Sequence, residues 1–178
     1  MIIIANTNTP HHNNLYGYWE TGFLDYNDTA TLVTPITVLE SAGEVALTND
    51  GLGAYSTRQY APRGIEDVWN ASTGQFDWSM LSLGDVVDIR LDIEVTTTTP
   101  NTAIDVKLNL GSNTYNLPFI TQFNYKSAAP HSITEYNSFY IGNEGTLNGG
   151  GHFSLSSDED CTVKVRGWYI KITRKRNL

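Results

Sequence analysis

The chain has 178 residues and a mass of 19.8 kDa, which suits a single domain able to bury a sizeable core. Its formal net charge is −8, and all 19 acidic residues precede Lys164, whereas 6 of the 11 lysines and arginines lie from Lys164 onward. An acidic body argues against nucleic-acid binding, which depends on neutralising phosphates; the basic end suits an acidic partner surface or a neighbouring subunit.

Cys161 is the only cysteine, which excludes an intrachain disulfide and a cysteine-based metal cluster. Its place in an apolar strand pattern favours a small buried side chain over a nucleophile. The apolar run Ile2–Ala5 is too short for a signal peptide or a membrane span. We therefore expect synthesis in a cytoplasm, no contact with a membrane and no cofactor.

Residues 1–14 are expected to form an extended arm that precedes one domain, 15–178. The arm combines an apolar tip, Ile2, Ile3 and Ile4, with the polar run NTNTPHHNN, which is typical of turns and disorder. The tip either adds a strand to the domain, which we favour, or inserts into a partner. The adjacent His11 and His12 point to opposite sides of an extended chain, so we expect solvated histidines and no metal site.

Leu15–Tyr26 is rich in aromatic residues, among them Tyr16, Tyr18 and Trp19. Such rings can form a sugar-binding platform, because they present large flat surfaces for stacking. Packing of a first strand against the core is the favoured interpretation.

Thr29–Val38 is β-branched and predicts a strand interrupted at Pro35. Gly53–Arg63 then predicts a polar loop that carries Tyr55, Arg58 and Tyr60. Arginine and tyrosine together are typical of recognition surfaces. Asp67–Ser79 predicts a hairpin whose aromatic residues seal one end of the core; these are Trp69, Phe76 and Trp78.

Leu81–Leu110 has the clearest pattern in the chain. Val87, Ile89, Leu91, Ile93 and Val95 alternate with charged residues, and Ile104, Val106, Leu108 and Leu110 repeat the alternation. Each run predicts a strand with one buried face. The polar run Thr96–Thr102 predicts a hairpin loop that pairs the two strands.

Further strands are expected at Thr114–Phe123 and Tyr136–Ile141, followed by a flexible connection at Glu144–Gly151. The last strand is expected at Cys161–Thr173, and the chain then closes with an exposed basic tail formed by Arg174, Lys175 and Arg176.

In the last strand, the apolar residues change from odd-numbered to even-numbered positions at Gly167. Val163 and Val165 are odd-numbered, whereas Trp168, Ile170 and Ile172 are even-numbered. A β-bulge at Gly167 would let both sets share the core, and this is the favoured interpretation. Without a bulge, the second set would form an outward apolar patch between subunits. The basic residues of the opposite face are expected to meet acidic strands, such as Asp88–Glu94, of a neighbouring subunit.

Strand patterns at short spacing with turn signals between them, and no sustained helical period, predict an all-β protein. We expect an antiparallel β-sandwich of the jelly-roll type. The motifs GxSxG, HExxH and the phosphate-binding loop are missing from the sequence. The carboxylates of Asp88, Asp92 and Glu94 fall on the polar face of one strand. We therefore expect a protein without catalytic activity.

Three segments carry a resemblance to a known group: FDWSMLSLGDVVDIRLDIEVTT, FYIGN and VKVRGWYIKITR. Together they resemble small β-rich virion proteins of tailed bacteriophages, namely capsid decoration (cement) proteins and the knob domains of fibres. The resemblance covers about Leu32 to Arg174. It implies a jelly-roll subunit that forms trimers, as tumour-necrosis-factor-like and C1q-like modules do, and it implies no catalytic residues.

The leading functional hypothesis is therefore a homotrimeric decoration protein on the outer surface of a virion, bound to the major capsid protein and made in the host cytoplasm. The alternative is a receptor- or carbohydrate-binding knob of a fibre, with a glycan as partner. The candidate partner-binding residues are Ile2, Ile3, Ile4, Tyr16, Tyr18, Trp19, Tyr55, Arg58, Tyr60, Arg174, Lys175 and Arg176.

Overall fold

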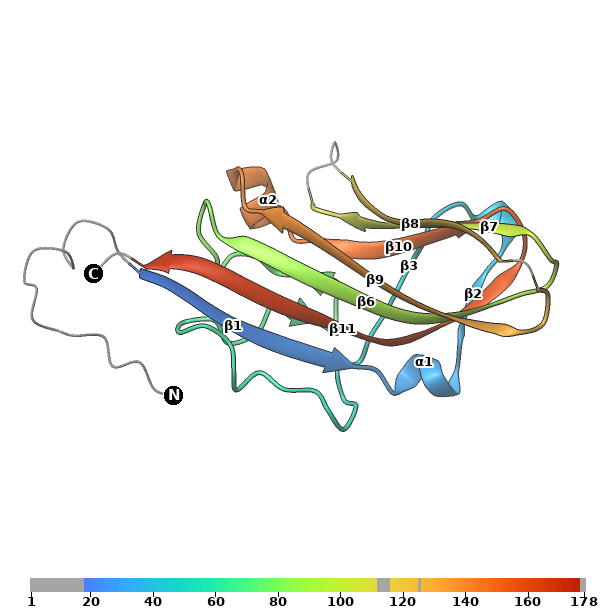
Figure 1. The fold of residues 1–178 in the computed structure, drawn as a ribbon, viewed down its shortest axis with the longest axis horizontal. Coiled ribbons are helices and arrows are strands. Elements are labelled where there is room, and N and C mark those ends of the chain that lie inside the picture. Colours follow the sequence, from blue (N-terminus) through green and yellow to red (C-terminus); the bar gives the residue numbers. More distant parts are fainter. Residues whose placement is uncertain (1–17, 112–115, 125, 177–178) are drawn as a thin grey trace, which may run out of the picture.

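The computed structural model describes residues 18–111, 116–124 and 126–176, without the side chains of 120–124, 175 and 176. Two antiparallel sheets pack face to face (Figure 1). The large sheet contains, in spatial order, β1 (Tyr18–Asn27), β11 (Cys161–Arg176), β6 (Val86–Thr97) and β9 (Pro130–Tyr140), with β2 (Ile36–Val38) also paired to β11. The small sheet contains β3 (Val45–Ala46), β10 (His152–Ser157), β7 (Thr102–Asn109) and β8 (Asn116–Asn124).

The strand order is that of a jelly roll. β1 and β2 pair with successive parts of the same side of β11, so they form one interrupted edge strand. Counted as one, they make an eight-stranded sandwich with the sheet orders 1-8-3-6 and 2-7-4-5. This arrangement is the double Greek key of jelly rolls. The predicted fold class is confirmed.

The core lies between the sheets and follows from the alternation of apolar residues. Every second residue of β6 and of β7 is buried, as a strand with one covered face requires. β11 contributes a third set of buried side chains; these are Val163, Val165, Trp168, Ile170 and Ile172. The alternation in Leu81–Leu110 therefore predicted the buried faces correctly.

The predicted pairing of β6 with β7 is wrong, because the two strands belong to different sheets. Their apolar faces meet across the core instead of lying side by side. The connecting turn leaves the plane of the large sheet at Asn101, whose φ is 63°. Thr102 holds this turn by donating a hydrogen bond from Oγ1 to the Thr99 carbonyl at 2.8 Å. Alternation alone cannot distinguish neighbours in a sheet from partners across a core.

The bulge in β11 is confirmed. The register against β6 shifts between Val165 and Gly167, so Arg166 is the extra residue. Trp168 is 1% exposed and Ile170 is fully buried. The alternative of an outward apolar patch is therefore wrong.

A short helix fills the break in the edge beside the bulge. α1 (Ala30–Val33) stands where a strand was predicted, and it ends before Pro35, whose ring disfavours helical backbone at the preceding residue. The Thr31 hydroxyl accepts a hydrogen bond from the Val165 amide at 2.7 Å, and the Asp28 amide donates to the Arg166 carbonyl at 3.1 Å. These bonds replace the ladder that an unbroken edge strand would supply.

The predicted hairpin at 67–79 is confirmed as β4 (Trp69–Asn70) and β5 (Gln75–Phe76). Trp69, Phe76 and Trp78 are buried at one end of the core. The predicted flexible connection is instead a helix, α2 (Glu144–Gly149), because the Asn143 side chain accepts a hydrogen bond from the Thr146 amide and caps its start. A 3₁₀ turn, η1 (Glu40–Ala42), links β2 to β3.

Candidate functional site

The outer face of the large sheet carries charged and aromatic side chains side by side. The alternation that buries one face of β6 turns Asp88, Arg90, Asp92 and Glu94 outward, beside the outward residues of β11. Lys171 Nζ lies 3.1 Å from Asp88 Oδ2, and Arg90 Nη2 lies 3.0 Å from Asp92 Oδ2. The face is therefore a network of paired charges.

Basic residues of β11 pair with β6 of the same subunit. Lys164 Nζ lies 3.2 Å from Glu94 Oε1, and Arg166 Nη2 lies 2.6 Å from Glu94 Oε2. The prediction that these cations meet an acidic strand of a neighbour is wrong, because the register of β11 on β6 places the two charge runs side by side. Hydrogen bonds from Arg166 and Lys164 lower the pKa of Glu94.

The replacement Glu94→Gln is expected to reduce the acid dependence of stability. A lowered folded-state pKa stabilises the fold above the unfolded-state pKa, near 4.5, and this contribution is lost as the pH falls through the folded-state pKa. Because both cations are well exposed, the contribution at neutral pH is about 0.5 kcal/mol. Urea unfolding at pH 7 and pH 3 measures this contribution: the variant is less stable than wild type at pH 7, and the difference is smaller at pH 3. An equal loss at both pH values, or the same behaviour in the exposed control Glu66→Gln, would contradict the assignment.

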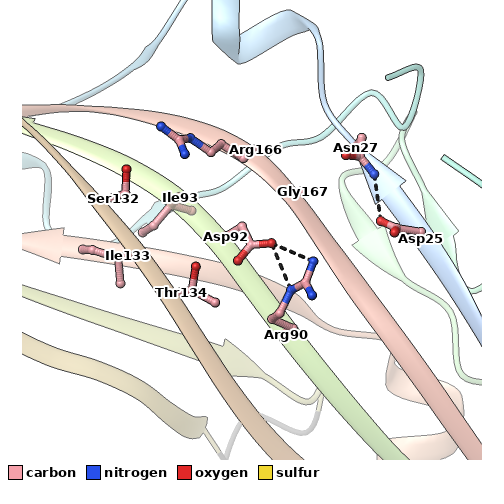
Figure 2. A pocket seen from close by; sticks show the side chains of 10 residues that line it. All are labelled: Asp25, Asn27, Arg90, Asp92, Ile93, Ser132, Ile133, Thr134, Arg166 and Gly167. Carbon is pink, nitrogen blue, oxygen red and sulfur yellow. Dashed lines mark hydrogen bonds and ion pairs between the residues drawn. The ribbon is translucent and has the colours of Figure 1, made fainter. Parts of the chain in front are cut away.

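A hollow of about 250 Å³ opens on this face beside the bulge. Figure 2 shows Asp25 and Asn27 on the β1 side, Asp92 and Arg90 on β6, and Thr134 on β9. The other residues that line it are Ile93, Ser132, Ile133, Arg166 and Gly167. The hollow is thus assembled from all four long strands of the large sheet.

The ionised groups of the hollow are held in defined positions. Asp92 Oδ2 accepts hydrogen bonds from Nε of Arg90 at 3.0 Å, and Asp25 Oδ1 accepts from Nδ2 of Asn27 at 2.8 Å. Burial raises the pKa of Asp25, and the Arg90 guanidinium opposes this shift. Both carboxylates are partly buried and have therefore lost some of their hydrating water. A polar ligand in the hollow can supply hydrogen bonds in place of that water.

Aromatic rings border the hollow on the same face. The Tyr169 ring lies 5.4 Å from that of Phe23, centre to centre, and Arg90 Cζ lies 5.5 Å from the Tyr169 ring. Phe23 in turn stacks on Tyr60 at 4.9 Å. Tyr136 on β9 lies opposite Arg90 in the register of β9 on β6, and it is 54% exposed. The result is a band of rings across the sheet next to the polar hollow.

The predicted site residues are only partly brought together. Tyr60 belongs to the band through Phe23. Trp19 and Tyr18 are exposed at the start of β1, opposite the end of β11. Tyr55 projects from the loop and is exposed. These residues do not form one surface with Arg58.

Arg58 has a structural position. Its guanidinium carbon lies 4.3 Å from the centre of the Tyr26 ring, and its Nε lies 3.4 Å from Asp67 Oδ2. Tyr26 is fully buried and donates its hydroxyl hydrogen bond to Asp67. Burial and this bond raise the pKa of Tyr26. Arg58 therefore anchors the loop to β1.

The predicted exposed basic tail is wrong for Arg174, which lies in β11 and is 7% exposed. Its Nε lies 3.4 Å from Oδ2 of the buried Asp85. β11 continues to Arg176 in register with β1, so Lys175 and Arg176 belong to a strand, although their side chains are not described. Ile2, Ile3, Ile4 and Tyr16 lie outside the described residues.

Sequence reasoning placed Asp92 on the polar face of a strand but missed the other polar residues that line the hollow. Asp25, Asn27 and Thr134 are polar residues at outward-facing positions of strands. The alternation of polar with apolar residues is the only feature of the sequence that marks them. Their proximity depends on the order of β1, β11, β6 and β9, which the sequence does not reveal.

No group of three or more histidine, cysteine, aspartate or glutamate side chains within the described residues could hold a metal ion. None of the helices in the described ranges is long and apolar enough to cross a membrane.

No protein-family model and no curated protein sequence matches the chain. Similar solved structures include Eiger TNF from S. frugiperda, with 8% identity and a TM-score of 0.40 over 90% of this chain and 94% of that one. The Gx strain of infectious bursal disease virus gives 9% identity and a TM-score of 0.41 over 90% of this chain and 33% of the viral chain. A CBM4 structure gives 10% identity and a TM-score of 0.33 over 87% of this chain and 95% of that one. At these values the likeness assigns no function.

Proposed function

We propose that this chain is a non-enzymatic virion protein, a homotrimeric decoration (cement) protein that binds the outer surface of the capsid through the major capsid protein. The observation that carries the proposal is the edge of the large sheet at β9. In the described part of the chain, β9 pairs with β6 on one side only. Tyr140, at the end of this strand and outside the hollow described above, is 67% exposed.

A long edge strand with an exposed ring at its end favours a contact with another chain. Unpaired strand edges invite pairing, and natural proteins cover or blunt them. Tyrosine is enriched in protein interfaces because its ring buries a large area and its hydroxyl stays hydrogen-bonded. In the proposed trimer, each β9 edge docks on a different surface of the next subunit, and three such contacts close a ring.

The choice of a virion partner comes from the resemblance to phage virion proteins. Its three segments, 76–97, 139–143 and 163–174, include β6, the end of β9 and most of β11. The resemblance thus lies in and beside the large sheet, whose edge is the proposed contact. The alternative, a fibre knob that binds a receptor, uses the same trimer with a different partner.

The replacement Tyr140→Asp is expected to dissociate the trimer, because the interface would have to bury an unpaired charge. Sedimentation equilibrium measures the mass, which should fall from about three times 19.8 kDa to a single subunit. The matched control is Tyr55→Asp, since Tyr55 is exposed on a loop away from β9 and should leave the mass unchanged.

Binding to the capsid is tested by co-sedimentation with phage heads that lack the protein, followed by imaging of the particles. Saturable binding at symmetry-related sites of the shell supports the decoration role. A protein that is monomeric at high concentration and also on the particle would overturn the trimer, and density confined to a tail or fibre would favour the knob.

A further inference from the structure

Charges of both signs line the hollow. Asp25 and Asp92 contribute two negative charges, and Arg90 and Arg166 contribute two positive charges. A phosphate, sulfate or carboxylate ligand would meet both aspartates, and a cation would meet both guanidinium groups. Each would then meet a charge of its own sign as well as one of the opposite sign, whereas a neutral polar ligand meets no such repulsion.

Hydrogen-bonding capacity remains in the hollow after the internal bonds are counted. Asp92 binds Arg90 through Oδ2, which leaves Oδ1 as an acceptor, and Asp25 likewise binds Asn27 through one oxygen. Within the described residues, the hydroxyls of Ser132 and Thr134 have no hydrogen-bond partner. Carboxylate and amide groups beside hydroxyls offer both acceptors and donors to a ligand that carries several hydroxyl groups.

β9 and β11, the strands on either side of β6, each carry a tyrosine at the next outward-facing position beyond the hollow. Tyr136 follows Thr134 on β9, and Tyr169 follows Gly167 on β11. An aromatic face covers the apolar C–H face of a sugar, while the polar groups take its hydroxyls. Gly167 has no side chain, so the hollow stays open next to the bulge.

From this combination we propose that the hollow on the outer face of the large sheet is a binding site for a neutral oligosaccharide. Asp25, Asn27 and Asp92 bind its hydroxyl groups, Thr134 supplies a further hydrogen bond, and Tyr136 packs on the adjoining ring. The proposal goes beyond the capsid-binding role, since a decoration protein needs no sugar ligand. The site differs from the predicted platform of Tyr18 and Trp19, which lies at the start of β1.

The test uses the full chain on an array of neutral and acidic glycans, followed by calorimetric titration with the neutral oligosaccharide that binds best. Wild type is expected to bind neutral glycans in preference to sialylated or sulfated ones. Thr134→Val keeps the side-chain shape and removes one hydroxyl, so affinity should fall about fivefold. Asp92→Asn should cause a loss of tenfold or more, because hydrogen bonds to charged groups are stronger.

The matched control is Thr162→Val, which makes the same change at an exposed outward position of β11 away from the hollow. It should bind as wild type does. Thermal unfolding of each variant separates lost binding from lost folding. If no neutral glycan binds, or if Thr134→Val and Thr162→Val lose affinity equally, the proposal is wrong. Neither result changes the mass or the capsid binding by which the proposed function is judged.

Discussion

Replacing Gly167 by valine is expected to lower the free energy of unfolding by about 3 kcal/mol. A Cβ atom at this position would lie 2.5 Å from the Tyr26 carbonyl oxygen and 3.2 Å from Asn27 Cα. Both are backbone atoms of β1, which pairs with β11 at this point. The neighbouring strand can give way only by breaking its ladder beside the bulge.

Urea unfolding measures the loss, and Gly167→Ala should already show much of it because the clash begins at Cβ. The matched control is Gly74→Ala, where φ is +66° but no atom lies within 4 Å of the added Cβ. It should cost about 1 kcal/mol, from backbone conformation alone. If Gly167→Val unfolds at the same urea concentration as wild type, β1 does not approach the bulge this closely.

The replacement Arg174→Met is expected to cost about 4 kcal/mol, because it leaves the buried Asp85 without its cation. Arg174 and Asp85 are 7% and 2% exposed, and their ion pair lies at the end of the sandwich. Arg174 also donates to the Ser82 hydroxyl at 3.3 Å and to the Met80 carbonyl at 3.4 Å. The pair therefore joins β11 to the turn that precedes β6.

The matched control for this prediction is Arg166→Met on the same strand. Arg166 pairs with Glu94 in an exposed position, so its loss should cost less than about 1 kcal/mol. Adding Asp85→Leu to Arg174→Met should recover part of the stability, since the uncompensated charge is then removed. Equal losses for the two arginine variants would show that Arg174 is as solvated as Arg166, contrary to the structure.

The fold class was predictable because its signal is local. Alternation in β6 and β7 marked the buried faces, and a change of parity at Gly167 marked the bulge. Pairing was not predictable in the same way. A hairpin and a crossing between sheets bury the same side chains of β6 and β7, so only the turn geometry at Asn101 separates them.

The candidate site was less predictable, since the residues of the hollow come from four different strands. Asp25 and Thr134 are more than a hundred positions apart and share a face only through the register of four strands. The basic run of β11 illustrates the same limit. Its charge was evident, but its partners, Asp88 and Glu94 of the same chain, depended on register.

The position of β11 also constrains how the protein can be made. This strand lies between β1 and β6, so the large sheet has no continuous ladder until residues 161–176 have left the ribosome. Until then, β1 and β6 expose their apolar faces, because neither strand has yet paired with β11. Contacts between residues this far apart in the sequence also form slowly. Folding of the large sheet is therefore completed only after β11 has been made, and until then the chain already carries all 19 of its acidic residues, whose net charge favours solubility.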